Sequence, residues 1–312
     1  MELFYGKGLL ASMLTWDHIE SLRDLTYHRT AKTRVSTIAQ ARRFVNTVGF
    51  CFAFTAKNSE LPCLWHAACG ERHPPYPEHT HSDPAIGLVW QAKDDLARDR
   101  SIYYGKAIKS RPSMISLEFF PSFYRLLDRP ASPDQFLVDY QAGALSPAAR
   151  RIMEALCQRS PMVTFELKMN SSMSHPRKRS EFDRAMAELQ MKMYVVKIDE
   201  FYDPFSFLWD LVSSRFQPEI EIARSLSLKA ARENILRQYF RLRWVSDAAA
   251  CRRLFNWPVE VVQTLLDHLQ QQDFLRQVKI ENGRKEVYAL ADLPEPSPYR
   301  RPVVSSKKRS RP

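Results

Sequence analysis

Apolar residues recur every three or four positions through most of the chain, and short apolar runs separate these segments. The pattern is clearest near the C-terminus, where a helix that ends at Phe255 is followed by a turn at Asn256–Trp257. Pro258 suits the first turn of the next helix, because its missing N–H has no intrahelical partner there. This second helix has one apolar stripe, made of Val262, Leu265, Leu266 and Leu269. Two helices joined by a tight turn are therefore predicted.

Two strands are predicted after these helices. Phe274–Ile280 and Lys285–Leu290 are rich in β-forming residues, and Asn282–Gly283 between them is a strong signal for a hairpin turn. A helix–turn–helix followed by a hairpin is the order of elements in a winged helix.

The same order is predicted upstream. A helix begins at Ser146–Pro147, Thr164 caps a short helix, and a third helix leads to a strand at Tyr194–Ile198. Ser227–Phe240 is predicted to form a bridging helix between the two copies.

The N-terminal third gives a less regular pattern. Helices are predicted at Thr15–Leu25 and Thr37–Val48, and mostly strands and turns from Gly87 to Leu127. The fold class is mainly α with small β-sheets. Five parts are expected: an N-terminal helical or winged-helix region (1–86), a β-rich segment (87–127), a second winged helix (128–215), a bridging helix with a third winged helix (216–296), and a basic disordered tail (297–312).

Composition supports a globular protein, since 45% of residues are hydrophobic and 26% are charged. The chain has no apolar stretch of the ~20 residues that a membrane span needs. Its first residues lack the basic segment followed by an apolar segment that is typical of a signal peptide. Five scattered cysteines indicate reduced thiols rather than a disulfide framework. A soluble cytoplasmic protein is expected.

The charge of the chain favours an anionic partner. The formal net charge is +11, and it falls by six to +5 without the cations of Ser297–Pro312. A mildly basic body of this kind suits nucleic acid first.

Cations cluster at three places in the predicted elements: a strand–turn region, the start of the second copy's third helix, and the last hairpin. These candidate DNA-binding residues are Lys106, Lys109, Arg111, Arg177, Lys178, Arg179, Arg184, Arg276, Lys279, Arg284 and Lys285. Such side chains contact phosphate and supply affinity rather than sequence choice. The alternative is that winged helices also serve as protein-interaction modules, and that these cations are ordinary surface residues.

Two other kinds of site are not expected. Four zinc ligands could come from Cys63, His66, Cys69 and His73. At three-residue spacing, however, such side chains point in different directions around a helix, and the segment has the pattern of an ordinary core helix. A P-loop and a dinucleotide-binding glycine motif are both missing from a chain with only 8 glycines. No metal and no nucleotide cofactor are predicted.

Several segments, in their order along the chain, resemble the AlkZ/YcaQ family of bacterial DNA glycosylases, which unhook interstrand crosslinks and excise bulky alkylated bases. The resemblance covers Thr15 to Leu293 and is carried by Ala39–Gly49, Leu61–Trp65, Tyr103–Lys106, Leu145–Leu156, Glu181–Gln190 and Glu286–Leu290. It implies tandem winged helices with a small β-barrel around a basic channel for DNA. Gly87–Leu127 would belong to that barrel.

The resemblance also locates a missing catalytic motif. The family has Gln, one apolar residue, then Gln or Asp, soon after the glycine that ends a helix; here Phe52 and Phe54 stand at the two polar positions. Phenylalanine cannot position water against the sugar C1′ as a base leaves. Asn46, Asn58 and Glu60 are the nearby groups that could substitute.

The leading hypothesis is therefore a monomeric, nucleoid-associated protein that binds duplex or damaged DNA but lacks the usual catalytic pair. One alternative is an active glycosylase with a relocated acid or amide. The other is a non-enzymatic interaction or regulatory protein built from winged helices.

Overall fold

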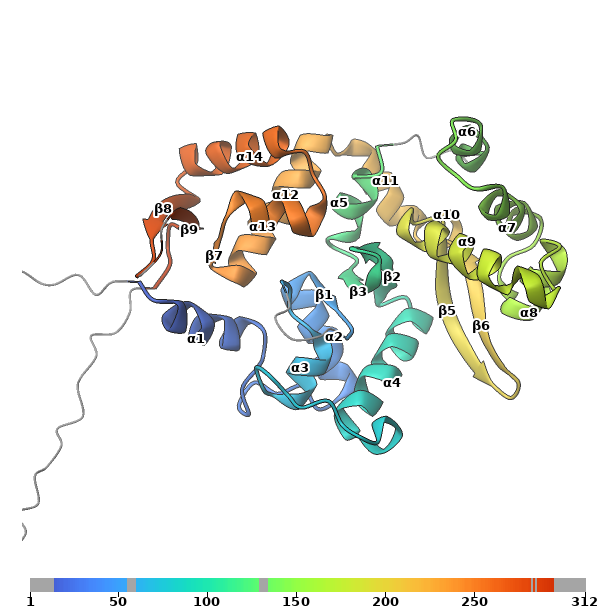
Figure 1. Cartoon of the computed structure of the whole chain (residues 1–312), viewed down its shortest axis with the longest axis horizontal. Coiled ribbons are helices and arrows are strands. Elements are labelled where there is room, and N and C mark those ends of the chain that lie inside the picture. Colours follow the sequence, from blue (N-terminus) through green and yellow to red (C-terminus); the bar gives the residue numbers. More distant parts are fainter. Residues whose placement is uncertain (1–13, 55–59, 129–133, 282, 284, 295–312) are drawn as a thin grey trace, which may run out of the picture.

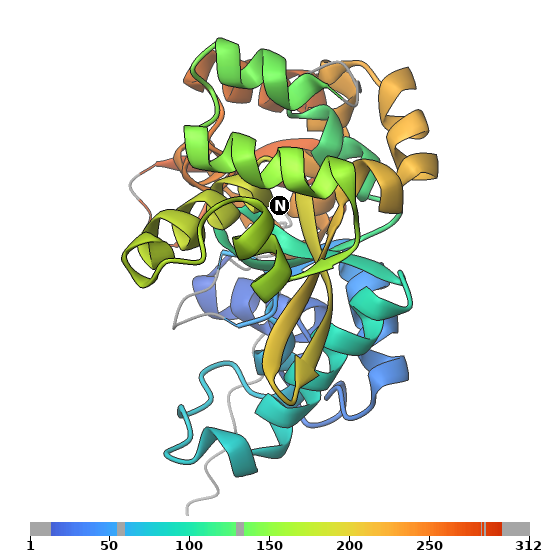
Figure 2. The same ribbon diagram turned by 90° about the vertical axis from the view of Figure 1, so that its right-hand side faces the viewer.

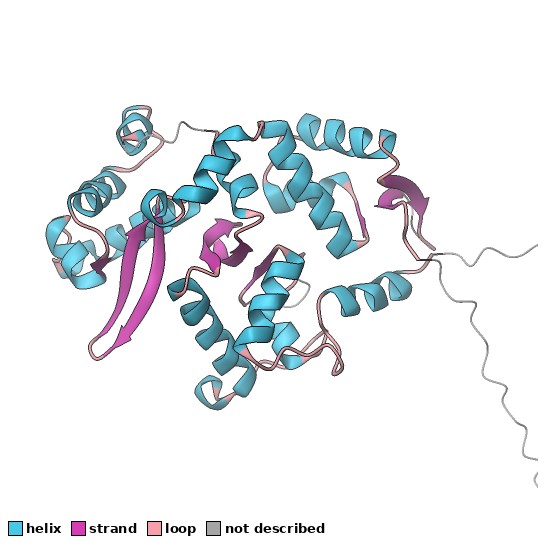
Figure 3. Cartoon of the chain, turned by 180° about the vertical axis from the view of Figure 1, so that it is seen from behind, coloured by secondary structure: helices cyan, strands magenta, loops and turns pink. Residues whose placement is uncertain are grey.

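Three segments of the chain repeat one order of elements: helix, strand, helix, helix, strand, strand. This computed structural model describes residues 14–54, 60–128, 134–281, 283 and 285–294. In each repeat the three strands form a small antiparallel sheet whose last strand lies in the middle. Figure 3 shows these small sheets lying apart among many helices.

The three repeats are called here the first, second and third units. The first unit contains α2 (Ile38–Val48), β1 (Phe50–Phe52), α3 (Leu64–Cys69), α4 (Pro84–Arg98), β2 (Ile102–Ile108) and β3 (Arg111–Ser116). The second contains α7 (Pro147–Gln158), β4 (Met162–Val163), α8 (Thr164–Asn170), α9 (Arg179–Met191), β5 (Val195–Tyr202) and β6 (Phe205–Leu211). The third contains α12 (Leu228–Arg243), β7 (Val245–Ser246), α13 (Ala248–Phe255), α14 (Val259–Gln271), β8 (Leu275–Lys279) and β9 (Glu286–Leu290).

Shorter elements connect and cover the units. They are α1 (Trp16–Thr26), η1 (Thr80–Ser82), α5 (Phe120–Arg125), α6 (Gln135–Gln141), η2 (Pro176–Lys178), α10 (Val212–Arg215) and α11 (Gln217–Ser225).

The main helices begin where the chain supplies a cap. The Thr37 side chain accepts a hydrogen bond from the Gln40 N–H at the start of α2, and Ser146, Ser227 and Asp247 cap α7, α12 and α13 in the same way. The predicted apolar stripe of α14 is fully buried. The helices predicted in the second and third units, and those at Thr15–Leu25 and Thr37–Val48, are confirmed within one to three residues at each end.

The three units form one elongated body with the first unit between the other two (Figure 1). α4 packs against β5, and α9 packs against β2, so the second unit meets the first along these elements. α5 packs against α11 and α12 on the other side. One apolar core runs through the first and third units, and the second unit has a core of its own.

The first helix completes the third unit. Ile19 of α1 is buried with Val245, Ala289 and Leu293, and the Glu281 N–H donates to the Leu14 carbonyl over 2.8 Å. The two ends of the described chain therefore lie side by side (Figure 1).

The prediction for Gly87–Leu127 was partly wrong. Its first part belongs to the 15-residue helix α4, which Pro84 begins and whose first turn is capped by the Asp83 carboxylate, an acceptor for the Ile86 N–H. Only β2 and β3 are strands, and they join β1 in an open three-stranded sheet. The described residues form no closed barrel, because β1 and β2 each remain an edge of this sheet.

Gly49 is expected to tolerate no side chain. It ends α2 with φ at +77°, and an added Cβ would lie 2.6 Å from a ring carbon of Phe119. Gly49→Ala should lower the free energy of unfolding by about 2–3 kcal/mol, measured by urea titration. Gly143→Ala is the matched control, because φ is +72° there but nothing lies within 4 Å of the new methyl group. An equal loss for both variants would mean that backbone strain alone, not the Phe119 contact, sets the cost.

Candidate nucleic-acid interface

A large hollow lies between the first and second units and is called here the interunit groove. Its volume is about 760 Å³. It lies where α4 and β2 of the first unit approach α8, α9 and the β5–β6 hairpin of the second (Figure 1). Its lining is Lys93, Tyr104, Lys106, Thr164, Lys168, Arg179, Phe182, Asp183, Met186, Gln190, Lys197, Glu200, Phe205, Ser206, Phe207 and Trp209. Cations and aromatic rings thus share one concave surface.

Four buried charges fix the inner wall of the groove. Lys93 Nζ lies 2.7 Å from Asp94 Oδ1 and 2.5 Å from Glu200 Oε1, while Lys197 Nζ lies 2.6 Å from Asp94 Oδ1 and also contacts Glu200. Burial tends to raise the pKa of Glu200, but its hydrogen bonds with Lys197 and Lys93 outweigh this and lower it. The cluster is neutral overall, so it holds β5 against α4 without adding positive charge to the groove.

Three cations at the rim leave positive charge available. Lys106 and Lys168 contact no carboxylate among the described residues, and Lys168 Nζ lies 5.0 Å from the centre of the Phe182 ring. Arg179 is 81% exposed, with its nearest carboxylate, that of Asp183, 4.0 Å away. Accessible cations with little or no neutralisation by carboxylates are suited to a polyanion.

The structure brings only two of the predicted cations, Lys106 and Arg179, into this groove. Arg177 and Arg184 are exposed beside Arg179, whereas Lys178 donates to the Ser172 carbonyl over 2.9 Å. The remaining described ones lie elsewhere: Lys109 and Arg111 near the β2–β3 turn, and Arg276, Lys279 and Lys285 exposed on the β8–β9 hairpin. Arg284 lies outside the described residues.

Sequence reasoning missed Lys168. Its position on the short helix α8 was predictable from the sequence, although the predicted cap by Thr164 is wrong, because that residue is the first of the helix and makes no capping bond. The approach of Lys168 to the Phe182 ring and to a groove wall from another unit depends on tertiary contacts. Nothing in the local pattern marks that approach.

Phe52 and Phe54 occupy an apolar environment. Phe52 is fully buried in β1, and Phe54 is half-buried against the same core. The Arg111 guanidinium lies 5.6 Å from the centre of the Phe52 ring. Neither side chain can hold or activate a water molecule.

The three substitute candidates are separated. Asn46 is exposed on α2, and Asn58 lies outside the described residues. Glu60 forms an ion pair of 2.8 Å with Lys109 and lines a second hollow of about 400 Å³, called here the arginine pocket. This pocket is also lined by Trp16, Glu20, Arg23, Tyr27, Arg29, His66, Arg72, His73 and Arg243.

His66 is predicted to make stability depend on pH. Burial and the nearby Arg29 and His73 lower the pKa of His66 to about 4. Its pKa in the unfolded chain is about 6.5, so the unfolded state binds more protons between these values. Stability should be full above pH 6.5 and fall by on the order of 2–3 kcal/mol as pH drops to about 4. Urea titrations of the protein and of His66→Phe test this, since the variant should lose that part of the pH slope.

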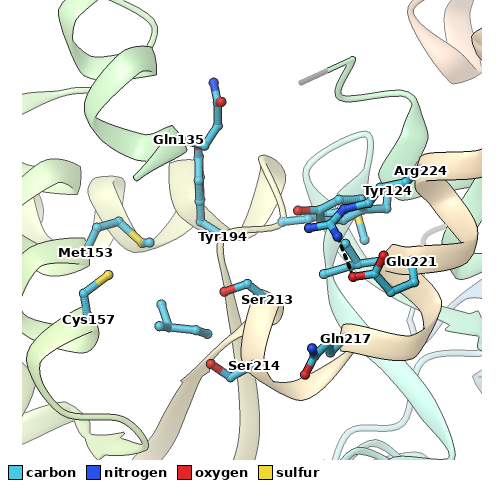
Figure 4. Close-up of a pocket in the computed structure, with 13 residues that line it drawn as sticks. Tyr124, Gln135, Met153, Cys157, Tyr194, Ser213, Ser214, Gln217, Glu221 and Arg224 are labelled. Carbon is cyan, nitrogen blue, oxygen red and sulfur yellow. Dashed lines mark hydrogen bonds and ion pairs between the residues drawn. The ribbon is translucent and has the colours of Figure 1, made fainter. Parts of the chain in front are cut away.

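A third hollow, of about 410 Å³, lies between the α6–α7 region and α10–α11 (Figure 4). Cys157 and Met153 stand on one side of it, and Glu221 contacts Arg224 on the other. Partial desolvation and the carboxylates of Asp134 and Glu154 raise the pKa of the Cys157 thiol, which keeps it protonated at neutral pH. This hollow therefore lacks an activated nucleophile, and it contains none of the predicted site residues.

No three His, Cys, Asp or Glu side chains in the described ranges gather as metal ligands would. Within the same ranges, every helix is too short or too polar to cross a bilayer.

Comparison with known proteins identifies related chains. The model of the AlkZ-related family matches residues 35–256. Among solved structures, the Streptomyces sahachiroi DNA glycosylase AlkZ has a similar fold, with a TM-score of 0.59 and 14% sequence identity over 89% of this chain and 70% of that one. No curated protein matches the sequence.

The family match covers more than two thirds of the chain and confirms the family predicted from the sequence. The structural likeness extends over all three units and supports the same fold. The chain belongs to the AlkZ-related family.

Proposed function

We propose that this protein binds DNA in a repair-related role, with the interunit groove as its main contact. The observation that carries the proposal is the rim of Lys106, Lys168 and Arg179, whose charges are largely unpaired and lie above a neutral inner wall. The family membership and the solved glycosylase of similar fold favour DNA over other polyanions.

Each unit is proposed to be a winged helix, since its order of elements and its strand order are those of that motif. The units differ in the charge of their third helix. α9 and the preceding η2 carry four cations, Arg177, Lys178, Arg179 and Arg184, against three carboxylates, Glu181, Asp183 and Glu188. α14 presents Glu260 and Asp267 and has no lysine or arginine. Of these two units, the second is therefore better suited to approach the phosphate backbone through its third helix.

The protein is proposed to lack base-excision activity of the family type. Excision needs a polar group that positions or activates water as the base leaves. Phe52 and Phe54 supply none, and the Glu60 carboxylate is already paired with Lys109. Binding without excision is what these side chains support.

A second candidate is an excision enzyme with relocated groups. It is favoured by one observation: Glu20 and Glu60 both line the arginine pocket. The Glu20 carboxylate is, however, paired with Arg23 and Arg29 at 2.5 and 2.9 Å. Ionised and paired in this way, it is poorly placed to act as a base.

Salt dependence tests the proposed DNA binding. Each phosphate contact adds about −0.9 to the slope of log affinity against log salt. Fluorescence anisotropy with a labelled duplex should show affinity falling by at least about 10²-fold between about 50 and 200 mM salt. No binding at the lower salt, or equal affinity at both, would refute the proposal.

A further inference from the structure

The β5–β6 hairpin carries a row of aromatic rings on one face. Successive strand residues point to opposite faces, so Phe205, Phe207 and Trp209 of β6 share a face. Their ring centres are 5.1 Å apart for Phe205–Phe207 and 5.7 Å apart for Phe207–Trp209, both edge to face. All three rings line the interunit groove. This row is called here the aromatic ladder.

The outer end of the ladder is exposed to solvent. Phe205 is 62% exposed, whereas Trp209 is buried and donates through Nε1 to the Thr164 hydroxyl over 3.0 Å. Phe201 and Tyr202 at the same hairpin end are also exposed. Figure 2 shows this hairpin extending well beyond the helices of its own unit. Three exposed aromatic side chains at one hairpin end are unusual on a monomer surface and indicate a binding function.

The charges around the ladder suit a nucleic-acid strand. Lys106, Lys168 and Arg179 lie along the same groove. Two carboxylates of the hairpin are neutralised, because Asp199 pairs with Arg98 at 2.7 Å and Glu200 pairs with Lys93 at 2.5 Å. Cations beside an aromatic row hold the phosphates while the rings contact base faces.

We propose that the exposed outer end of the aromatic ladder, above all Phe205, stacks on unpaired bases of DNA, so that the groove holds a locally single-stranded segment. In an intact duplex the faces of the bases are already stacked on one another, and an exposed ring can reach only their edges. A ring such as that of Phe205 therefore gains most from bases that have left the helix stack. This inference rests on the proposed DNA binding and specifies which form of DNA the groove prefers.

The test compares two labelled probes, a single strand of roughly 12 nucleotides and the duplex of the same sequence, within the range of site sizes known for such surfaces. Phe205→Ala should weaken single-strand binding by about 5- to 50-fold, because base–aromatic stacking contributes roughly 1–3 kcal/mol. Duplex affinity should change by less than about twofold on the same reasoning, since duplex bases do not reach the ring. Phe205→Tyr should retain the wild-type affinity, because its ring still stacks.

Phe165→Ala is the matched control. Phe165 is 70% exposed on α8 of the same unit but does not line the groove. The inference is overturned if Phe205→Ala leaves single-strand affinity unchanged, lowers both affinities equally, or has the same effect as Phe165→Ala. If the unaltered protein binds duplex but no single strand, this inference alone fails. If it binds neither probe, the proposed DNA binding fails with it.

Discussion

Replacing Lys106, Lys168 and Arg179 together by alanine is expected to weaken duplex binding by on the order of 10²-fold at about 0.1 M salt. Each of these cations lines the interunit groove. Among the described residues, the shortest distance from any of the three to a carboxylate is 4.0 Å, from Arg179 to Asp183. Removing three phosphate contacts should also make the salt slope shallower by about 3. Anisotropy titrations at several salt concentrations measure both quantities.

A control with the same loss of charge separates contact from net charge. Lys32, Arg224 and Lys229 do not line the groove, and their triple alanine variant removes the same three formal charges. It should weaken binding by less than about fivefold, through long-range attraction alone. If both triple variants weakened binding equally, the groove would not be the contact surface.

Replacing Arg23 by methionine is expected to lower the free energy of unfolding by about 3 kcal/mol. Arg23 is 4% exposed. It donates from Nε to the Arg243 carbonyl over 2.9 Å and from Nη2 to the Val245 carbonyl over 2.8 Å. Methionine fills much of the space but leaves both buried carbonyls without this donor, at roughly 1–3 kcal/mol each. Urea titration measures the loss.

Two comparisons identify the source of that loss. Arg23→Lys keeps the charge but loses the planar guanidinium group whose N–H groups reach both carbonyls, so it should lose nearly as much stability as Arg23→Met. Arg252→Met changes an exposed arginine of α13 and should shift stability by less than about 0.5 kcal/mol. A stable Arg23→Lys variant would show that charge, rather than the two carbonyl contacts, holds α1 on the third unit. Hydrogen exchange should additionally show faster opening of α1 in both Arg23 variants.

The regular elements were predictable because their signals are local. Caps such as Thr37, Ser146 and Asp247 lie within three residues of the N–H groups they satisfy. The stripe from Val262 to Leu269 repeats at helical spacing and is buried as expected. Local signals of this kind need no knowledge of the rest of the chain.

Helix α4 shows how such local signals can be overlooked. Asp83 and Pro84 form a clear helix start, and Ile86, Val89 and Leu96 are buried at helical spacing. The prediction instead gave mostly strands and turns from Gly87 onward, in agreement with the barrel implied by the family resemblance. The Asp83 cap predicts this segment better than the strand assignment does, because the capping hydrogen bond forms only at the start of a helix.

The candidate site was only partly predictable. Lys106 and Arg179 were identified as cations, but charge alone did not distinguish them from the paired Lys109. The ladder of Phe205, Phe207 and Trp209 follows a local alternation along β6, which the sequence analysis overlooked. The neutral cluster around Lys197, by contrast, arises where two units meet. Contacts between units distant in sequence leave no local pattern, so the groove itself emerges only in the folded structure.

This chain is proposed to bind DNA without excising bases, and an excision assay paired with a binding titration distinguishes the two activities. The pure protein is incubated with duplex carrying an alkylated purine or an interstrand crosslink. Alkali then cleaves any abasic sites, while a binding titration is run on the same DNA. The expected result is binding that weakens with salt, together with strand cleavage no higher than in a control without protein. Cleavage well above that control would contradict it, and would direct attention to Glu60 and Glu20 in the arginine pocket.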